Sequence, residues 1–219
     1  EALLKSNIPY TMVGGTKFYS RKEIRDLIAY LTIVANPADN ISFERIVNEP
    51  KRGVGPGTLD KLRQFAYESD QSLLEAASNL LMSPLKGKAA QAIMDLANIL
   101  GQLRQDLDQM SITDLAEALL EKTGYLDSLR LQNTLESQAR IENIEEFLSV
   151  TKNFDESSAS QEEDETGVDR LGRFLNDLAL IADTDDSQAE ASEVTLMTLH
   201  AAKCLEFPVV FLIGMEEGV

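Results

Sequence analysis

Two patterns of apolar residues divide the chain. From residue 20 to about residue 182, apolar residues recur every three or four positions, which is typical of amphipathic helices. Outside this stretch, short segments at 8–13, 194–199 and 209–213 have the pattern of strands, and the last two are continuous apolar runs rich in β-branched side chains. Such runs suit strands that are buried on both faces of a parallel sheet. The pattern therefore predicts a helical insertion flanked by two pieces of an α/β domain.

The helical stretch is divided by proline, glycine and polar clusters. We predict helices at 20–36, 41–47, 59–67, 72–81, 87–110, 113–122, 125–131, 134–154 and 168–182. The first begins with Ser20-Arg21-Lys22-Glu23, in which the serine is expected to cap the helix while Glu23 reaches back. Two acidic segments, 155–165 and 183–193, have almost nothing apolar to bury and are predicted to be solvated loops.

The segment Lys51–Leu59 links two of the short helices and carries glycine at alternate positions, 53, 55 and 57. Glycine permits positive φ angles and close approach of another chain. Pro56 suits the first position of the second helix, where its missing N–H is no loss. The free N–H groups at such a helix start can hold a phosphate, assisted by the positive end of the helix dipole. This pattern has two interpretations: a clamp on a nucleic-acid backbone, or a tight turn without a ligand.

The charge distribution favours the clamp. The net charge is -17, but residues 1–65 hold ten Lys/Arg against seven Asp/Glu, a balance of +3, so the remainder carries -20. An acidic remainder would repel nucleic acid everywhere except near the glycine-rich segment. The predicted contacts to DNA phosphates are sequence-independent. The candidate DNA-binding residues of this segment are Lys51, Arg52, Gly53, Val54, Gly55, Gly57, Thr58 and Lys61.

Composition excludes several other classes of protein. One cysteine, Cys204, and one histidine, His200, can build neither a disulfide framework nor a structural zinc site, so no metal site is predicted. The single cysteine is consistent with a reducing cytoplasm. No apolar run approaches the ~20 residues of a membrane span, and no signal-peptide pattern is present at the start, so we expect no membrane partner.

The segment between the last two predicted strands, Thr198-Leu199-His200-Ala201-Ala202-Lys203-Cys204-Leu205-Glu206-Phe207, resembles the T-x-H-x-x-K-G-L-E-F motif of superfamily-1 DNA helicases of the UvrD/PcrA/Rep type, the PcrA branch most closely. Further segments resemble the same family in the same order along the whole chain. These are Gly14-Gly15-x-Lys17-Phe18-x-x-Arg21-x-Glu23-Ile24-x-Asp26, Arg52-Gly53-Val54-Gly55, Arg140-Ile141-Glu142-Asn143 and Pro208 to Gly218.

The resemblance implies a piece of an ATP-dependent 3′-to-5′ DNA helicase of repair or replication. Residues 16–192 would be the helical accessory subdomain 2B, with a helix-hairpin-helix-like motif that meets duplex DNA. Residues 1–15 and 193–219 would be parts of the RecA-like motor domain 2A. In that family the equivalents of Thr198 and His200 lie near single-stranded DNA phosphates, and those of Cys204 and Glu206 lie near the nucleotide. Accessory repair or replication proteins are possible further partners.

The chain lacks the parts that ATP hydrolysis needs. It contains no G-x-x-x-x-G-K-[ST] phosphate loop. We therefore expect no catalytic residue and no cofactor in this chain, with ATP and Mg²⁺ bound by the intact enzyme. Cys204 stands where the family has glycine, and its interpretation as a small apolar filler or as an altered position stays open. The alternative to the helicase interpretation is an α-helical protein-interaction adaptor without nucleic-acid binding.

Overall fold

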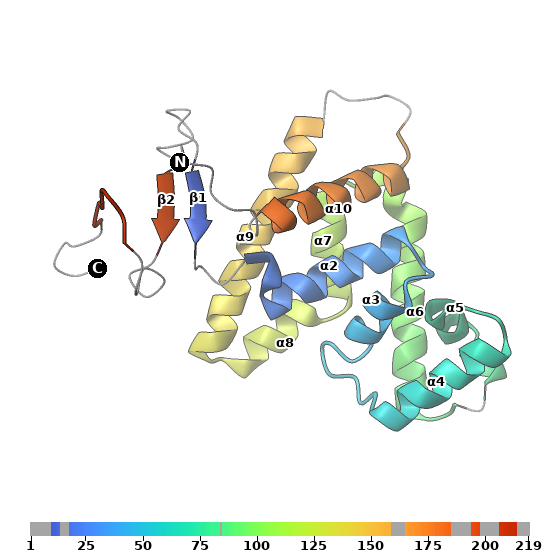
Figure 1. Cartoon of the computed structure of the whole chain (residues 1–219). Helices are drawn as coiled ribbons and strands as arrows, with labels where there is room; N and C mark the ends of the chain where they lie inside the picture. The colour runs from blue at the N-terminus through green and yellow to red at the C-terminus, as the bar shows by residue number, and fades with distance from the viewer. Residues whose placement is uncertain are drawn as a thin grey trace. The chain divides into compact units, whose positions relative to one another are not determined.

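The computed structural model describes residues 10–13, 18–83, 85–158, 165–184, 194–197 and 206–213, and it is mainly helical, as predicted (Figure 1). The chain divides into two compact units: a helical unit, 18–181, and a strand unit, 1–17 with 182–219. The described elements are β1 (Tyr10–Val13), the 3-10 turn η1 (Phe18–Ser20), α2 (Lys22–Ala35), α3 (Asn40–Ile46), α4 (Pro56–Glu68), α5 (Leu73–Ser78), η2 (Leu80–Met82), α6 (Lys88–Asp106), η3 (Leu107–Gln109), α7 (Ile112–Lys122), α8 (Tyr125–Gln132), α9 (Leu135–Ser158), α10 (Gly167–Thr184) and β2 (Val194–Met197).

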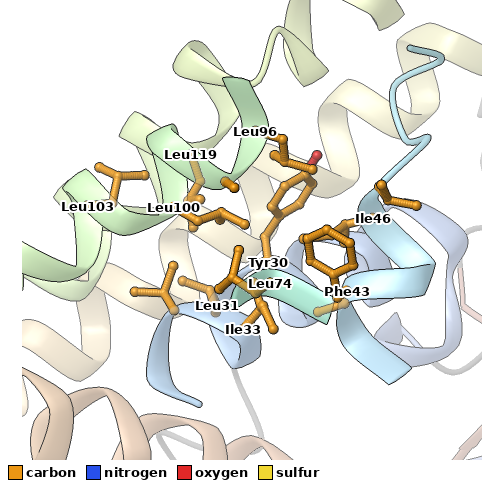
Figure 2. Packing of buried hydrophobic residues seen from close by; sticks show 14 of the residues in the cluster. Tyr30, Leu31, Ile33, Phe43, Ile46, Leu74, Leu96, Leu100, Leu103 and Leu119 are labelled. Atoms are coloured by element: carbon orange, nitrogen blue, oxygen red, sulfur yellow. The ribbon is translucent and has the colours of Figure 1, made fainter. Parts of the chain in front are cut away.

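Helix α2 lies at the centre of the helical unit and packs against α3, α6, α7 and α9 (Figure 1). The sequence predicted one apolar face on this helix, but α2 is buried on most of its sides. Figure 2 shows Tyr30 of α2 among Phe43 and Ile46 of α3 and Leu96 and Leu100 of α6. A helix that is surrounded in this way holds its neighbours in place, including α3, which precedes the glycine-rich segment.

The start of α2 differs from the predicted capping box. The helix begins at Lys22, its N-cap residue is Arg21, and no side chain caps it. Glu23 points inward instead, is 4% exposed, and accepts a hydrogen bond of 2.6 Å from Nδ2 of Asn143 on α9. A buried carboxylate must be paired, and Arg140, with Nε 3.9 Å away, supplies the charge. Because this tertiary pairing occupies the carboxylate, Glu23 does not reach back to cap its own helix.

The predicted acidic loop is also shorter at its start than expected, because α9 continues to Ser158. Asp155 accepts hydrogen bonds from the N–H groups of Ile112 at 3.0 Å and Thr113 at 2.9 Å. Its Oδ2 also accepts one of 2.6 Å from the hydroxyl of Thr113. A carboxylate at the first turn of α7 satisfies N–H groups that have no partner within the helix. Asp155 therefore fastens α9 to α7, and the remaining residues 159–164 of the predicted loop lie outside the described part.

In the strand unit, β1 and β2 pair in parallel, with Thr11 opposite Thr195 and Val13 opposite Met197. This pair joins a segment that precedes the helical unit in the sequence to one that follows it. The third predicted strand is wrong: Val209–Ile213 is described without strand structure, and its side chains are exposed. A run becomes a strand only when its backbone groups pair with a neighbour, and the described residues provide no third partner. Within the described ranges, no helix is long and apolar enough to cross a membrane.

Candidate nucleic-acid interface

The glycine-rich segment forms the loop between α3 and α4, and the ends of both helices are well defined. Asp39 caps α3 by accepting hydrogen bonds from the N–H groups of Ile41 at 3.0 Å and Ser42 at 3.1 Å. Gly55 is the N-cap of α4, and Pro56 occupies the first helical position, as the sequence predicted. We call residues Val47–Gly57 the hairpin loop.

Asn48 organises the interior of the hairpin loop. Its Oδ1 accepts hydrogen bonds from the backbone N–H of Arg52 at 2.9 Å and of Val54 at 3.1 Å. The side chain of Val54 is buried, so this candidate DNA-binding residue faces the core. Alternate residues of the loop are therefore held inward by Asn48 and by the core.

The three glycines of the hairpin loop leave their backbone N–H groups without a protein acceptor among the described residues. Within the described part of the chain, the N–H groups of Gly53, Gly55 and Gly57 have no hydrogen-bond acceptor, while those of Thr58 and Leu59 donate to the carbonyl of Gly55. Gly53 has a φ of +74°, a left-handed conformation that favours glycine. The result is three unpartnered donors at alternate positions, ending at the N-terminus of α4, where the helix dipole is positive.

The fold does not need glycine at positions 55 and 57. Neither has a positive φ, and a Cβ at either position would meet no heavy atom within 4 Å. No described part of the chain fills the space beside these two glycines. Glycine at these two positions therefore leaves the backbone accessible to an external group, and an added side chain would block that access.

Arg52 does not lie where the sequence placed it. Its Nη1 donates to the carbonyls of Ile46 and Glu49, both at 2.9 Å, and its Nη2 donates to the hydroxyl of Tyr30 at 2.8 Å. The guanidinium therefore turns into the loop and does not project toward solvent as a phosphate ligand. A second flanking cation, Arg63, is likewise engaged, with Glu44 at 2.6 Å and Asp60 at 2.8 Å.

Two of the predicted cations remain exposed, Lys51 and Lys61, and the structure adds a third. Lys86 comes from the turn between η2 and α6 and lines the same groove as Lys61. This groove has a volume of about 360 Å³ and is lined by Gly55, Pro56, Gly57, Thr58, Lys61, Leu85, Lys86 and Ala89. Sequence reasoning missed Lys86 because 25 positions separate it from Lys61. The residues Leu85-Lys86-Gly87 before α6 predict only a turn.

The other candidate residues belong to the strand unit. Thr198, His200 and Cys204 lie outside the described residues. Glu206 is described and its side chain is exposed. Among the residues that the structure describes, no group of three His, Cys, Asp or Glu side chains could hold a metal ion. The hairpin loop is therefore the candidate site for which the structure gives a geometry.

Comparison with known proteins adds a family to this geometry. The family described as UvrD-like helicase C-terminal domain matches residues 1–219. The chain is 48% identical over 220 residues to the ATP-dependent DNA helicase PcrA of Leuconostoc citreum and 49% identical over 225 residues to that of Bacillus subtilis (strain 168). The PcrA of Staphylococcus aureus (strain Mu50 / ATCC 700699) is 44% identical over 219 residues. Each match covers 100% of this chain and 29% of the relative's length.

Proposed function

Because the chain belongs to the UvrD-like helicase C-terminal domain family, we propose that it is part of an ATP-dependent 3′-to-5′ DNA helicase of repair or replication. The helical unit is then the accessory subdomain 2B, which binds duplex DNA and regulates the motor. The strand unit is part of the RecA-like motor domain 2A, into which the helical unit is inserted. The identity of 44–49% to three PcrA helicases supports this assignment.

The observation that carries the DNA-binding role is the row of three unpartnered N–H groups at Gly53, Gly55 and Gly57. A phosphate oxygen accepts hydrogen bonds from such donors, and the N-terminus of α4 adds a favourable field. Two of the three glycines keep the surface open without serving the chain's own fold. We propose that α3, the hairpin loop and α4 form a helix-hairpin-helix-like motif that holds the backbone of duplex DNA.

Three exposed lysines provide the charge for this contact. Lys51 lies in the loop, Lys61 on the first turns of α4, and Lys86 in the turn before α6, where it lines the same groove as Lys61. Each lysine that neutralises a phosphate releases condensed counterions, so the affinity should depend on salt but not on sequence. The hydroxyl of Thr58, which also lines the groove, completes the proposed contact surface.

ATP and Mg²⁺ are bound by the intact enzyme in this proposal, because the chain has no phosphate-loop motif. Thr198 and His200 are assigned to single-stranded DNA phosphates by their resemblance to the family motif. On the same basis, Cys204 and Glu206 are assigned to the neighbourhood of the nucleotide.

The test is the binding of the 219-residue chain to a short duplex across a salt series, measured by fluorescence anisotropy. If the three lysines contact one phosphate each, the slope of log K against log salt is about -2.7, and the affinity falls roughly 40-fold between about 50 and 200 mM salt. Replacing Lys51, Lys61 and Lys86 by glutamate should abolish this binding. Lys152→Glu, at an exposed lysine on α9, is the control for one charge reversal away from the groove. Equal affinities for the triple variant and the control would favour the adaptor.

A further inference from the structure

We propose that Arg52 is a positioning residue that holds the row of N–H groups in the hairpin loop, and that buried Tyr30 acts through it. This inference rests on the proposed function, because it concerns how the same surface is presented to a phosphate backbone. It assigns DNA affinity to a core tyrosine that no DNA can touch. It also removes Arg52 from the set of direct phosphate ligands.

The guanidinium of Arg52 binds backbone carbonyls on the inner side of the hairpin loop. Nη1 donates to the carbonyls of Ile46 and Glu49 at 2.9 Å, with Pro50 at 3.3 Å and Val47 at 3.4 Å. These carbonyls belong to the end of α3 and the first half of the loop. One cation thus gathers four neighbouring carbonyls that would otherwise need water. Because the N–H of Arg52 is held by Asn48, both its backbone and its side chain are fixed immediately before Gly53.

A second set of contacts connects the loop to the core. Nη2 of Arg52 donates to the hydroxyl of Tyr30 at 2.8 Å and to the carbonyl of Thr123, after α7, at 3.3 Å. The Tyr30 hydroxyl in turn donates to the carbonyl of Glu49 at 2.5 Å. Burial raises the pKa of Tyr30, although the charge of Arg52 opposes the rise, so the hydroxyl keeps the proton that it donates. Tyr30 is 1% exposed and is fixed by the helices around α2.

The chemistry of this arrangement requires arginine. A guanidinium presents five N–H donors in a rigid planar fork, whereas lysine presents three donors on one flexible point. Within the described residues Arg52 has no carboxylate partner within 4.0 Å, and its protein partners are carbonyls and a hydroxyl. A lysine at this position cannot hold Ile46, Glu49 and Tyr30 together.

The decisive variant is Tyr30→Phe, with Tyr125→Phe as its matched control. Both residues are buried tyrosines with ring centroids 6.5 Å apart, and both lose one hydroxyl. The hydroxyl of Tyr125 donates to Asp26 at 2.9 Å and does not touch the loop. Tyr30→Phe should lower duplex affinity about 5- to 10-fold, the equivalent of one hydrogen bond lost from the network. Tyr125→Phe should lower thermal stability but leave the affinity unchanged.

The salt slope separates positioning from direct contact. Removing a cation that touches a phosphate makes the slope about 0.9 less steep, whereas Tyr30→Phe removes no charge and should leave the slope unchanged. Arg52→Lys keeps the charge but should lose at least as much affinity as Tyr30→Phe. All measurements are made on the 219-residue chain well below the unfolding temperature of each variant. If the Arg52 variants do not fold, the comparison of Tyr30→Phe with Tyr125→Phe decides alone.

Two results would overturn this inference. One is wild-type affinity for Tyr30→Phe in a chain whose binding still depends on Lys51, Lys61 and Lys86. The other is full affinity for Arg52→Lys together with a slope about 0.9 less steep for Arg52→Gln, which would make Arg52 a phosphate ligand. Both results leave the proposed function standing. Failure of the lysine variants to weaken binding would instead remove the proposed function itself.

Discussion

Replacing Gly167 by alanine should destabilise the helical unit, because the added methyl group has no room. Gly167 is the first residue of α10, and a Cβ there would lie 2.4 Å from the carbonyl oxygen of Leu107 and 2.8 Å from the amide nitrogen of Asp108. Both are backbone atoms, so neither can rotate away. The N–H of Gly167 also donates to Oδ1 of Asp108 at 2.6 Å. A shift of α10 that relieves the overlap would therefore stretch this hydrogen bond.

The expected cost follows from these two effects. Overpacking of this kind costs about 1–3 kcal/mol, and a weakened hydrogen bond adds about 1 kcal/mol. A unit of this size loses about 2–4 °C in Tm per kcal/mol, so Gly167→Ala should lower Tm by about 5–15 °C. The control is Gly172→Ala in the same helix, where a Cβ meets no heavy atom within 4 Å. Alanine there should stabilise the helix by about 0.5–1 kcal/mol.

Thermal unfolding followed by far-UV circular dichroism measures both variants. The two alanines are predicted to shift Tm in opposite directions within one helix. A Gly167→Ala chain that unfolds at the wild-type temperature, while Gly172→Ala gains stability, would contradict the close packing of α10 on the connection between α6 and α7.

Two further predictions concern carboxylates. Asp155→Ala should lower stability by about 1–2 kcal/mol, because it removes the acceptor for the first N–H groups of α7, and an unchanged Tm would show that water replaces it. Glu44→Gln should lower Tm at neutral pH but not at low pH, because the hydrogen bond from Arg63 lowers the pKa of Glu44 below its ordinary value of 4.5. A lowered carboxyl pKa means that the contribution is complete above pH 4.5 and is lost as pH falls through the folded-state pKa. The difference in Tm between wild type and Glu44→Gln should therefore shrink below pH 4.5, and a constant difference would contradict this.

The local patterns of the sequence predict the helices well, because their apolar spacing and break residues act within a few positions. Tertiary pairing decides what the patterns miss. Ser20 and Glu23 have the spacing of a capping box, but Glu23 pairs with Asn143, which lies 120 positions away. Asp155 lies in a segment whose composition predicts a solvated loop, yet its carboxylate accepts a hydrogen bond from the first residue of α7. Neither partner can be predicted from the residues nearby in the sequence.

The candidate site shows the same division. The glycine spacing and Pro56 predict the start of α4, because backbone geometry is a local property. The direction of a long side chain is not local: Arg52 resembles any exposed cation in sequence, but Tyr30 and the loop carbonyls draw it inward. Lys86 reaches the groove only through the packing of α5 between α4 and α6. That the surface binds DNA stays a prediction.

The most direct test of that prediction is duplex binding by Gly55→Val. Gly55 has φ -89° and ψ 171°, an extended conformation that valine adopts readily, and its Cβ position is free of neighbours within 4 Å. The chain should therefore still fold, with a loss of about 1 kcal/mol or less because valine is a poorer N-cap than glycine. The control Gly101→Ala on α6 should gain stability, as Gly172→Ala should, and leave the affinity unchanged. If phosphates approach the backbone here, the β-branched side chain should cost at least one charge-assisted hydrogen bond and lower duplex affinity about tenfold or more. Wild-type affinity for a fully folded Gly55→Val chain would contradict the account.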